Sequence, residues 1–222
     1  MSEWKTCRLG EVVDTNLKSI SKNYPHKIIK YLDTGSITKN HIDEYQFYPI
    51  EKAPSRAKRL VKNGDIIYSL VRPIQKHFGF ISNPDENLVV STGFCVLTSK
   101  QDSLDSKFLY YLLSLDESIE YLDMLAESST SAYPAIKPID IENLEITMPS
   151  DIEEQRRIAE ILSSLDDKID LLHKQNKTLE SLARLLFRHH FIDNAKSEWE
   201  EKPLSEIAEI SIGRTPPRKE KE

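Results

Sequence analysis

Short apolar runs broken by turn signals dominate residues 1–149. Four of these runs are rich in β-branched or aromatic residues, and turn pairs such as Asn63-Gly64 separate them, which predicts β-strands. They read HKIIKYL, GDIIYSLV, FGFIS and LVVSTGFCVLTS. A further short strand is predicted within YPAIKPIDIENLEITMPS, which ends where a much longer pattern begins.

One stretch of the same region has a helical period. In SKFLYYLLSLDESIEYLDMLAE, residues 106–127, apolar residues recur three and four positions apart, and Asp105 precedes them as an N-cap. A single helix is therefore predicted there among the strands. Together these elements predict an α+β fold, with one mixed α/β domain over residues 1–149.

Residues 154–187 carry a longer pattern, in which apolar positions alternate at steps of four and three. Such a heptad repeat is typical of a coiled coil, whereas a helix lying on a globular core, the alternative, is usually shorter and has a broader stripe. We term the repeated positions the seam; they are Ile158, Leu162, Leu165, Ile169, Leu172, Asn176, Leu179, Ala183 and Leu186. Ser150 as N-cap with Glu153 three residues later predicts a capping box at the helix start.

Asn176 interrupts the apolar seam. If Ile158 occupies heptad position d, Asn176 falls at position a, where a buried polar side chain costs stability unless another polar group meets it. We therefore expect Asn176 to fix the register of a paired helix.

The two tryptophans of the chain open two similar segments. WKTCRLGEVVD begins at Trp4 and WEEKPLSEIAE at Trp199, 195 residues later, with three identities and four similar pairs in eleven positions. A match this short can arise by chance, but its place after the long helix indicates that a repeated unit restarts there. The predicted order is a domain over residues 1–149, a helix for dimerisation and spacing over residues 150–192, and a linker with the start of a second, incomplete unit over residues 193–222.

Charge is distributed unevenly around a net value of −6. Residues 52–76 hold seven basic residues and one acid, whereas residues 102–127 hold seven acids and one base. The basic residues of the first stretch are Lys52, Arg56, Lys58, Arg59, Lys62, Arg72 and Lys76. Such a stretch predicts contacts with nucleic-acid phosphates, and a solvated surface loop is the alternative.

Composition is that of an ordinary soluble protein, with 39% hydrophobic and 30% charged residues. No apolar run approaches the ~18 residues of a membrane span, and the start MSEWKTCRLGEVVD lacks the pattern of a secretory signal. Cys7 and Cys95 are isolated, which is typical of free thiols in a reducing compartment. We expect a cytoplasmic protein that does not enter a membrane.

Candidate catalytic motifs are weak. Pro84-Asp85 with the later Asp105 and Lys107 matches the loose PD…(D/E)xK pattern, in which two carboxylates hold Mg²⁺, but a helix cap explains Asp105 equally well. We find no GxGxxG loop, no Walker A sequence and no His-rich metal spacing, so no cofactor or metal is predicted. A binding protein without catalytic residues is favoured; a stand-alone nuclease and a coiled-coil adaptor that does not bind DNA are the alternatives.

Several stretches of the chain together resemble the specificity (S) subunit of type I restriction-modification enzymes. The resemblance rests on WKTCRLGEVVD, SRAKRLVKNGDIIYSLVRP, YPAIKPIDIENLEITMPS with EEQRRIAEILSSLDDKID, and the restart WEEKPLSEIAEIS, in that order. It implies target recognition domains that each read half of a split DNA site, joined by long antiparallel helices. It also implies a non-catalytic subunit that docks methyltransferase (M) subunits and, through them, restriction (R) subunits. One recognition domain is expected here, as a half-subunit or a truncated form.

The resemblance implies that the basic stretch contacts double-stranded DNA. Lys52 belongs to the expected interface, and the residues suited to phosphate contacts are Arg56, Lys58, Arg59 and Lys62. Those expected to reach base edges are Arg72, Gln75, Lys76 and His77, and the hydroxyl-rich SSTSAY adds Ser129, Thr130, Ser131 and Tyr133. For each of them a solvated surface position is the alternative.

The seam has no second helix of the same chain predicted to cover it. We therefore expect two copies to pair antiparallel through residues 150–190 as a homodimer. A symmetric pair would carry two identical recognition domains and prefer a split palindromic site.

Overall fold

The computed structural model describes residues 3–100, 102–129, 133–196, 198–200, 202–209 and 213. The chain falls into two compact units, Met1–Asp167 and Lys168–Glu222. No helix in the described part of the chain is long and apolar enough to cross a membrane.

Four strands of the first unit form an antiparallel sheet in the order β2-β11-β8-β9. They are β2 (Val13–Thr15), β8 (Ile66–Ser69), β9 (Phe78–Phe80) and β11 (Phe94–Ser99). Successive residues of a strand point to opposite faces, so Cys95 and Leu97 of β11 join one hydrophobic core while Phe94 and Val96 join another.

A second sheet has the order β6-β3-β10-β7, with β3 parallel to β10 and the other pairs antiparallel. Its strands are β3 (Ile28–Leu32), β6 (Gln46–Pro49), β7 (Ala57–Leu60) and β10 (Leu88–Ser91). Leu32 and Val90 of this sheet meet Phe94 and Val96 of the first in one core. The two sheets therefore pack face to face.

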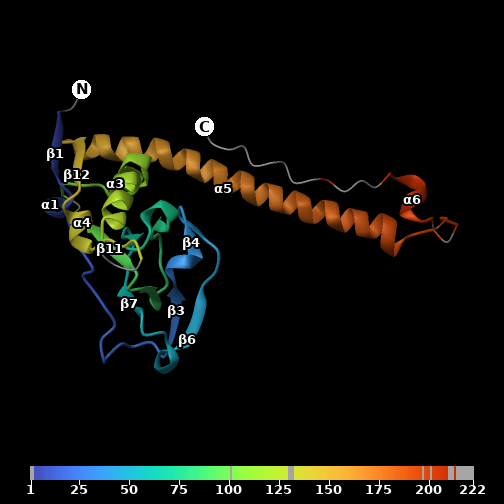
Figure 1. The fold of residues 1–222 in the computed structure, drawn as a ribbon, viewed down its shortest axis with the longest axis horizontal. Helices are drawn as coiled ribbons and strands as arrows, with labels where there is room; N and C mark the ends of the chain where they lie inside the picture. The colour runs from blue at the N-terminus through green and yellow to red at the C-terminus, as the bar shows by residue number, and fades with distance from the viewer. Residues whose placement is uncertain are drawn as a thin grey trace. The chain divides into compact units, whose positions relative to one another are not determined.

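Helices cover the other face of the first sheet, as Figure 1 shows for α3, α4 and the start of α5 beside β11. They are α2 (Ser106–Ser114), α3 (Asp116–Glu127), α4 (Pro138–Glu142) and α5 (Ile152–Arg188). A two-stranded antiparallel sheet of β1 (Trp4–Arg8) and β12 (Glu145–Pro149) borders this layer, with α1 (Leu9–Val12) after β1. The remaining short elements are η1 (Thr34–Ser36), β4 (Ile37–Thr38), β5 (His41–Ile42), η2 (Ile50–Lys52) and η3 (Pro73–Gln75).

The predicted α+β fold is confirmed, and each run predicted as a strand forms one or two strands. The helix predicted over residues 106–127 is wrong in one respect, because it is two helices broken at Leu115, whose backbone is extended (φ −62°, ψ 139°). Ser114 Oγ donates to the Tyr111 carbonyl and Ser118 Oγ to the Leu112 carbonyl, so side chains satisfy the last carbonyls of α2. Asp105 caps α2 as predicted.

The long helix forms as predicted, but its cap does not. The Glu153 amide donates to Oδ1 of Asp151 over 3.0 Å, so Asp151 is the N-cap. Ser150 cannot play this part because its own amide donates to the Glu3 carbonyl over 2.8 Å and extends the β1–β12 pairing.

In the second unit α5 continues to Arg188, and a π-helical turn, η4 (His189–Asp193), follows it. A four-residue helix, α6 (Leu204–Ile207), lies further along. The ring of Phe191 lies 5.0 Å from that of Phe187 and 6.0 Å from that of Trp199, measured between centroids.

Candidate nucleic-acid interface

The turn between β10 and β11 connects the two sheets and gathers other loops around it. The Thr92 amide donates to the Arg56 carbonyl, and the Leu70 amide donates to the Gly93 carbonyl, both over 2.8 Å. Arg56 directly precedes β7 and Leu70 directly follows β8. Part of the basic stretch and the loop after β8 therefore meet at this turn, which we term the sheet junction (Thr92-Gly93).

The loop that contains η1 touches the sheet junction. A Cβ atom on Gly93 would lie 2.8 Å from Cγ2 of Thr34, so a side chain at this position would displace that of Thr34. Burial raises the pKa of nearby Tyr31, and the positive charge of Arg56 offsets part of that rise. Because β3 and β10 are parallel, η1 and the sheet junction extend from the same end of the second sheet, here termed the junction edge.

The loop between β8 and β9 carries the residues predicted to read bases. Arg72 and Lys76, on either side of η3, adopt left-handed conformations with φ of 48° and 58°. Each costs on the order of 1 kcal/mol in a residue other than glycine, so other contacts must hold the loop. The Ile136 amide donates to the Leu70 carbonyl over 2.8 Å, and the Arg72 amide donates to the Pro134 carbonyl over 3.1 Å.

Arg72 and Gln75 are exposed on this loop. The guanidinium of Arg72 lies 5.9 Å from the centroid of the Tyr133 ring, which brings two predicted interface residues together. Ser129, at the end of the segment after α3, is half-buried. Thr130 and Ser131 lie outside the described residues.

Lys76 and His77 are engaged within the domain. Nζ of Lys76 lies 2.7 Å from Oδ1 of Asp116 on α3, and this hydrogen bond and charge lower the pKa of Asp116. Nδ1 of His77 lies 2.6 Å from the Ile37 carbonyl, to which it donates. Both side chains would have to break or share these contacts to reach a base.

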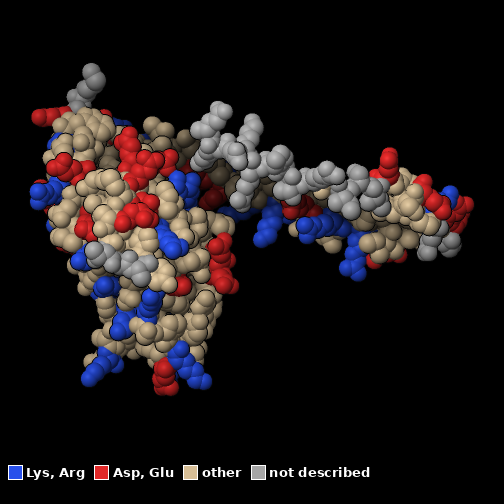
Figure 2. Space-filling model, viewed as in Figure 1, with Lys and Arg blue, Asp and Glu red and all other residues tan. Residues whose placement is uncertain are grey.

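The basic stretch does not form one patch. Arg56 lies at the junction edge, but β7 runs antiparallel to β10, so Lys62 beyond the end of β7 lies at the opposite edge. Lys52 lies at that opposite edge too, because the Ile50 amide donates to the carbonyl of Lys27, just before β3. Figure 2 shows Lys and Arg side chains at the end of the unit below β3 and β6, and acidic side chains over α3.

Lys58 and Arg59, which lie within β7, have different surroundings. Lys58 is exposed, whereas Arg59 is half-buried and its Nε is buried without a hydrogen-bond partner among the described residues. Burial raises the pKa of Cys95 to about 12, and the charge of Arg59 offsets a little of that rise, which places Arg59 near the interior. Arg59 is therefore the least accessible of the residues predicted to contact phosphates.

Two uncharged turns at the junction edge were missed from the sequence. Thr34-Gly35 follows β3, and Thr92-Gly93 follows β10. A Thr-Gly pair within two residues of a strand's end was the available signal, since it supplies a hydroxyl beside open backbone amides. Charge was the criterion used, and neither turn carries any.

The two carboxylates of the PD…(D/E)xK pattern make other contacts. Oδ2 of Asp85 accepts from Nζ of Lys30 over 2.7 Å, and Oδ1 of Asp105 accepts from the Phe108 amide over 3.0 Å as the cap of α2. The two carboxylates therefore do not converge on one metal position. Among the residues that the structure describes, no three His, Cys, Asp or Glu side chains are grouped to hold a metal ion.

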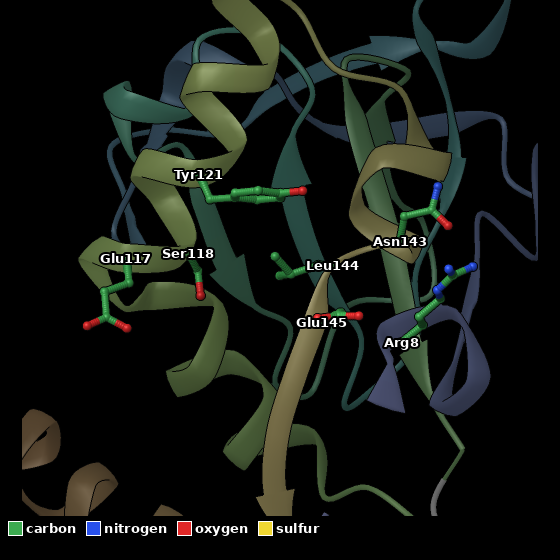
Figure 3. Close-up of a pocket in the computed structure, with 7 residues that line it drawn as sticks. All are labelled: Arg8, Glu117, Ser118, Tyr121, Asn143, Leu144 and Glu145. Carbon is green, nitrogen blue, oxygen red and sulfur yellow. The ribbon is translucent and has the colours of Figure 1, made fainter. Parts of the chain in front are cut away.

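An open hollow of about 560 Å³ lies between α3 and the β1–β12 pair. In Figure 3 the ring of Tyr121 extends across it from α3, with Arg8 and Asn143 on the far side. Its lining mixes one guanidinium with the carboxylates of Glu117 and Glu145. It marks the place where the end of β1 meets the helical layer.

Residues 1–181 match the family model described as type I restriction modification DNA specificity domain. The HindI specificity subunit of Haemophilus influenzae is 34% identical over 194 residues, which are 87% of this chain and 42% of that protein. The MjaIX specificity subunit of Methanocaldococcus jannaschii is 32% identical over 179 residues, 73% of this chain and 40% of that protein. The chain spans about two fifths of the length of these curated relatives.

Solved structures have the same fold. The crystal structure of the HsdS subunit from Thermoanaerobacter tengcongensis matches with a TM-score of 0.66 at 25% identity, over 97% of this chain and 57% of that one. A chain from a study of assembly and conformational transition of the type I R-M system matches with a TM-score of 0.63 at 24% identity, over the same shares.

Proposed function

Because the chain belongs to the family of type I restriction-modification DNA specificity domains, we propose that it is the non-catalytic DNA-binding specificity component of such a system. It directs methyltransferase (M) subunits, and through them restriction (R) subunits, to a split site on double-stranded DNA. The observation that carries this proposal is the family match over residues 1–181, together with curated relatives that are named specificity subunits. A cytoplasmic location follows from that function.

Three segments have separate tasks in this proposal. Residues 1–149 form the recognition domain, residues 150–192 form the spacer and dimerisation helix, and residues 193–222 begin a second unit. The short helices α1 and α6, which lie 195 residues apart like the two tryptophans, support the idea of a second unit.

We place the DNA at the junction edge. Arg56 and Arg72 are exposed there, on two loops that the sheet junction holds together, and Gln75 lies on the same loop as Arg72. Exposed guanidinium groups suit phosphates and guanine edges, and the amide of Gln75 suits an adenine edge. The opposite edge, with Lys27 and Lys52, is also basic and provides the control.

The experiment compares two double substitutions that remove the same charge. Arg56→Ala with Arg72→Ala is expected to weaken DNA binding by the full chain with its M subunit. It should also lower the slope of log K against log[salt] by ~0.9 for each phosphate that the protein no longer neutralises. Lys27→Ala with Lys52→Ala should leave the slope unchanged. The reverse result would place the DNA at the opposite edge, and no binding by the wild-type complex would refute the function.

Two copies pair antiparallel through the seam in this proposal. Beyond Ile158, which packs on the core of its own domain, the apolar seam residues are exposed: Leu162, Leu165, Ile169, Leu172, Leu179, Ala183 and Leu186. Exposed apolar positions that recur with a heptad period are what a helical partner covers. Paired copies would present two identical recognition domains to a palindromic split site.

The pair is tested by light scattering with two matched variants. Leu165→Asp with Leu172→Asp should give monomers, because it buries two charges at seam positions. Ser164→Asp with Ser181→Asp adds the same charges off the seam and should leave dimers. A wild-type monomer at high micromolar concentration, alone and with the M subunit, would contradict the pairing.

A further inference from the structure

Residues 199–209 repeat the sequence of residues 4–14, and α6 within them repeats the local structure of α1. The helices α1 and α6 are each four residues long, and the residue after each is extended. In each, the amide of the residue after the helix donates to the carbonyl of its first residue, Leu9 or Leu204. The short helix and its C-terminal cap therefore have the same backbone form in the two segments.

The surroundings of the two segments differ. Leu9 is fully buried and Val12 is 6% exposed, whereas the matching Leu204 and Ile207 are 60% and 71% exposed. The apolar side chains that fix the first segment to its domain therefore reach solvent in the second. A surface shaped like the one that covers Leu9 and Val12 would cover them.

That surface is made by β12 and α4, and β11 continues it by pairing with Val13 and Asp14. The Ser150 amide donates to the Glu3 carbonyl, and the Leu9 amide donates to the Leu144 carbonyl over 2.9 Å. In an antiparallel pair the bonded positions alternate, so residues 3, 5, 7 and 9 bond to β12 and its flanks while the amide of Arg8 points away. Pro203 takes the place of Arg8 in the second segment. Proline lacks an N–H group, and at this position it removes no hydrogen bond to β12.

At one position the second segment would fit the surface of β12 and α4 less well than the first. Gly10 packs closely on α4, and a Cβ atom added to it would lie 3.0 Å from Cβ of Glu142. Ser205 takes the place of Gly10 in the second segment. Residues 199–209 would therefore fit the surface of β12 and α4 with one tight contact that residues 4–14 avoid.

We propose that residues 199–209 of one chain replace residues 4–14 on β12 and α4 of a second copy. The exchange rests on the antiparallel pair of the proposed function, which brings the two together. In such a pair, the mean of the numbers of two facing residues is the residue number at which the two-fold axis crosses the helix. An axis between Leu172 and Asn176 places Ser150, next to β12, opposite residues between 194 and 202. The exchange also withdraws Arg8 from the wall of the hollow in Figure 3.

Disulfide trapping between differently tagged full-length chains tests the exchange. One chain carries Glu145→Cys, the other carries Pro203→Cys, and both carry Cys7→Ser. Residue 145 faces residue 8 at a non-bonded position, where Cα atoms are ~4.5 Å apart and within reach of a disulfide. Cys95 is buried and its raised pKa of about 12 keeps it unreactive. Mild oxidation should give mixed-tag dimers, and Lys196→Cys in place of Pro203→Cys should give few.

Two further variants sharpen the result. Ser205→Gly, which removes the tight contact, should raise the trapped yield several-fold, and Leu204→Asp with Ile207→Asp should abolish it while light scattering still shows a dimer. If the protein is dimeric but its yield of mixed-tag disulfides is no higher than that of the Lys196→Cys control, the exchange alone is overturned. A wild-type monomer would overturn the exchange and the pairing together. An unchanged yield with Ser205→Gly would contradict the proposed fit.

Discussion

The helix α5 has two parts that share one pattern and have different neighbours. In the first part Gln155 and Ala159 are buried, and Gln155 makes three hydrogen bonds, accepting from the Asp105 amide and donating to the carbonyls of Pro149 and Ser103. In the second part Asn176, three heptads after Gln155, and the seam alanine Ala183 are exposed. Residue type and period alone therefore do not tell which turns of a helix belong to a domain and which await a partner.

The largest expected difference lies between the two amides. Gln155→Ala should lower the free energy of unfolding by about 3 kcal/mol, because it leaves the buried Pro149 carbonyl and the half-buried Asp105 amide and Ser103 carbonyl without this partner. Asn176→Ala should change the free energy of unfolding of the domain by less than about 0.5 kcal/mol, because Asn176 is exposed within its own chain. Urea denaturation of both variants at several protein concentrations measures this. Equal effects would show that the two parts of α5 are not distinct.

The two alanines give a smaller contrast. Ala159→Leu should destabilise the domain by about 1–3 kcal/mol, since added atoms overpack a core. Ala183→Leu adds the same atoms at an exposed seam position and should leave unfolding of the domain unchanged while strengthening association of the two copies. Thermal unfolding measures the stability of the domain, and light scattering measures the association of the two copies. Destabilisation by both substitutions would mean that Ala183 is covered within its own chain.

The smallest change in stability is expected for Tyr111, at the boundary between the two parts of α5. Its hydroxyl donates to Oδ2 of Asp166 on α5 over 2.8 Å, so Tyr111→Phe should cost about 0.5–1 kcal/mol. Burial and this hydrogen bond raise the pKa of Tyr111. The folded state therefore keeps a proton that the unfolded state releases, and stability should fall as pH rises above ~10. Phe at this position should make that alkaline loss shallower, and an unchanged pH profile would argue against the contact.

Local signals predicted the secondary structure well. Alternation of β-branched residues identified the strands, and the seam identified α5, because both patterns depend on which face of an element is covered. The break at Leu115 was not predictable from the period, since apolar spacing continues across it. The cap of α5 was misassigned because Ser150 is drawn into the β1–β12 pairing by Glu3, far away in the sequence.

The candidate interface was predicted less completely. Proximity in sequence placed Arg56 and Lys62 in one basic stretch, but a strand separates them and puts them at opposite edges of a sheet. The pairing of Lys76 with Asp116 joins residues 40 positions apart. Contacts of this kind depend on the packing of whole elements, which local patterns do not contain.

The close approach of Gly93 to Thr34 bears on how the specificity of such a domain can change. The loop with η1 and the loop after β8 both contact Gly93, so a bulkier residue at Gly93 would shift both. Substitutions in the two loops should therefore show strong epistasis, with each tolerated in one sequence background and harmful in another. New target preferences would then arise through paired changes across the sheet junction, and libraries that vary both loops together should yield them more often than libraries that vary one.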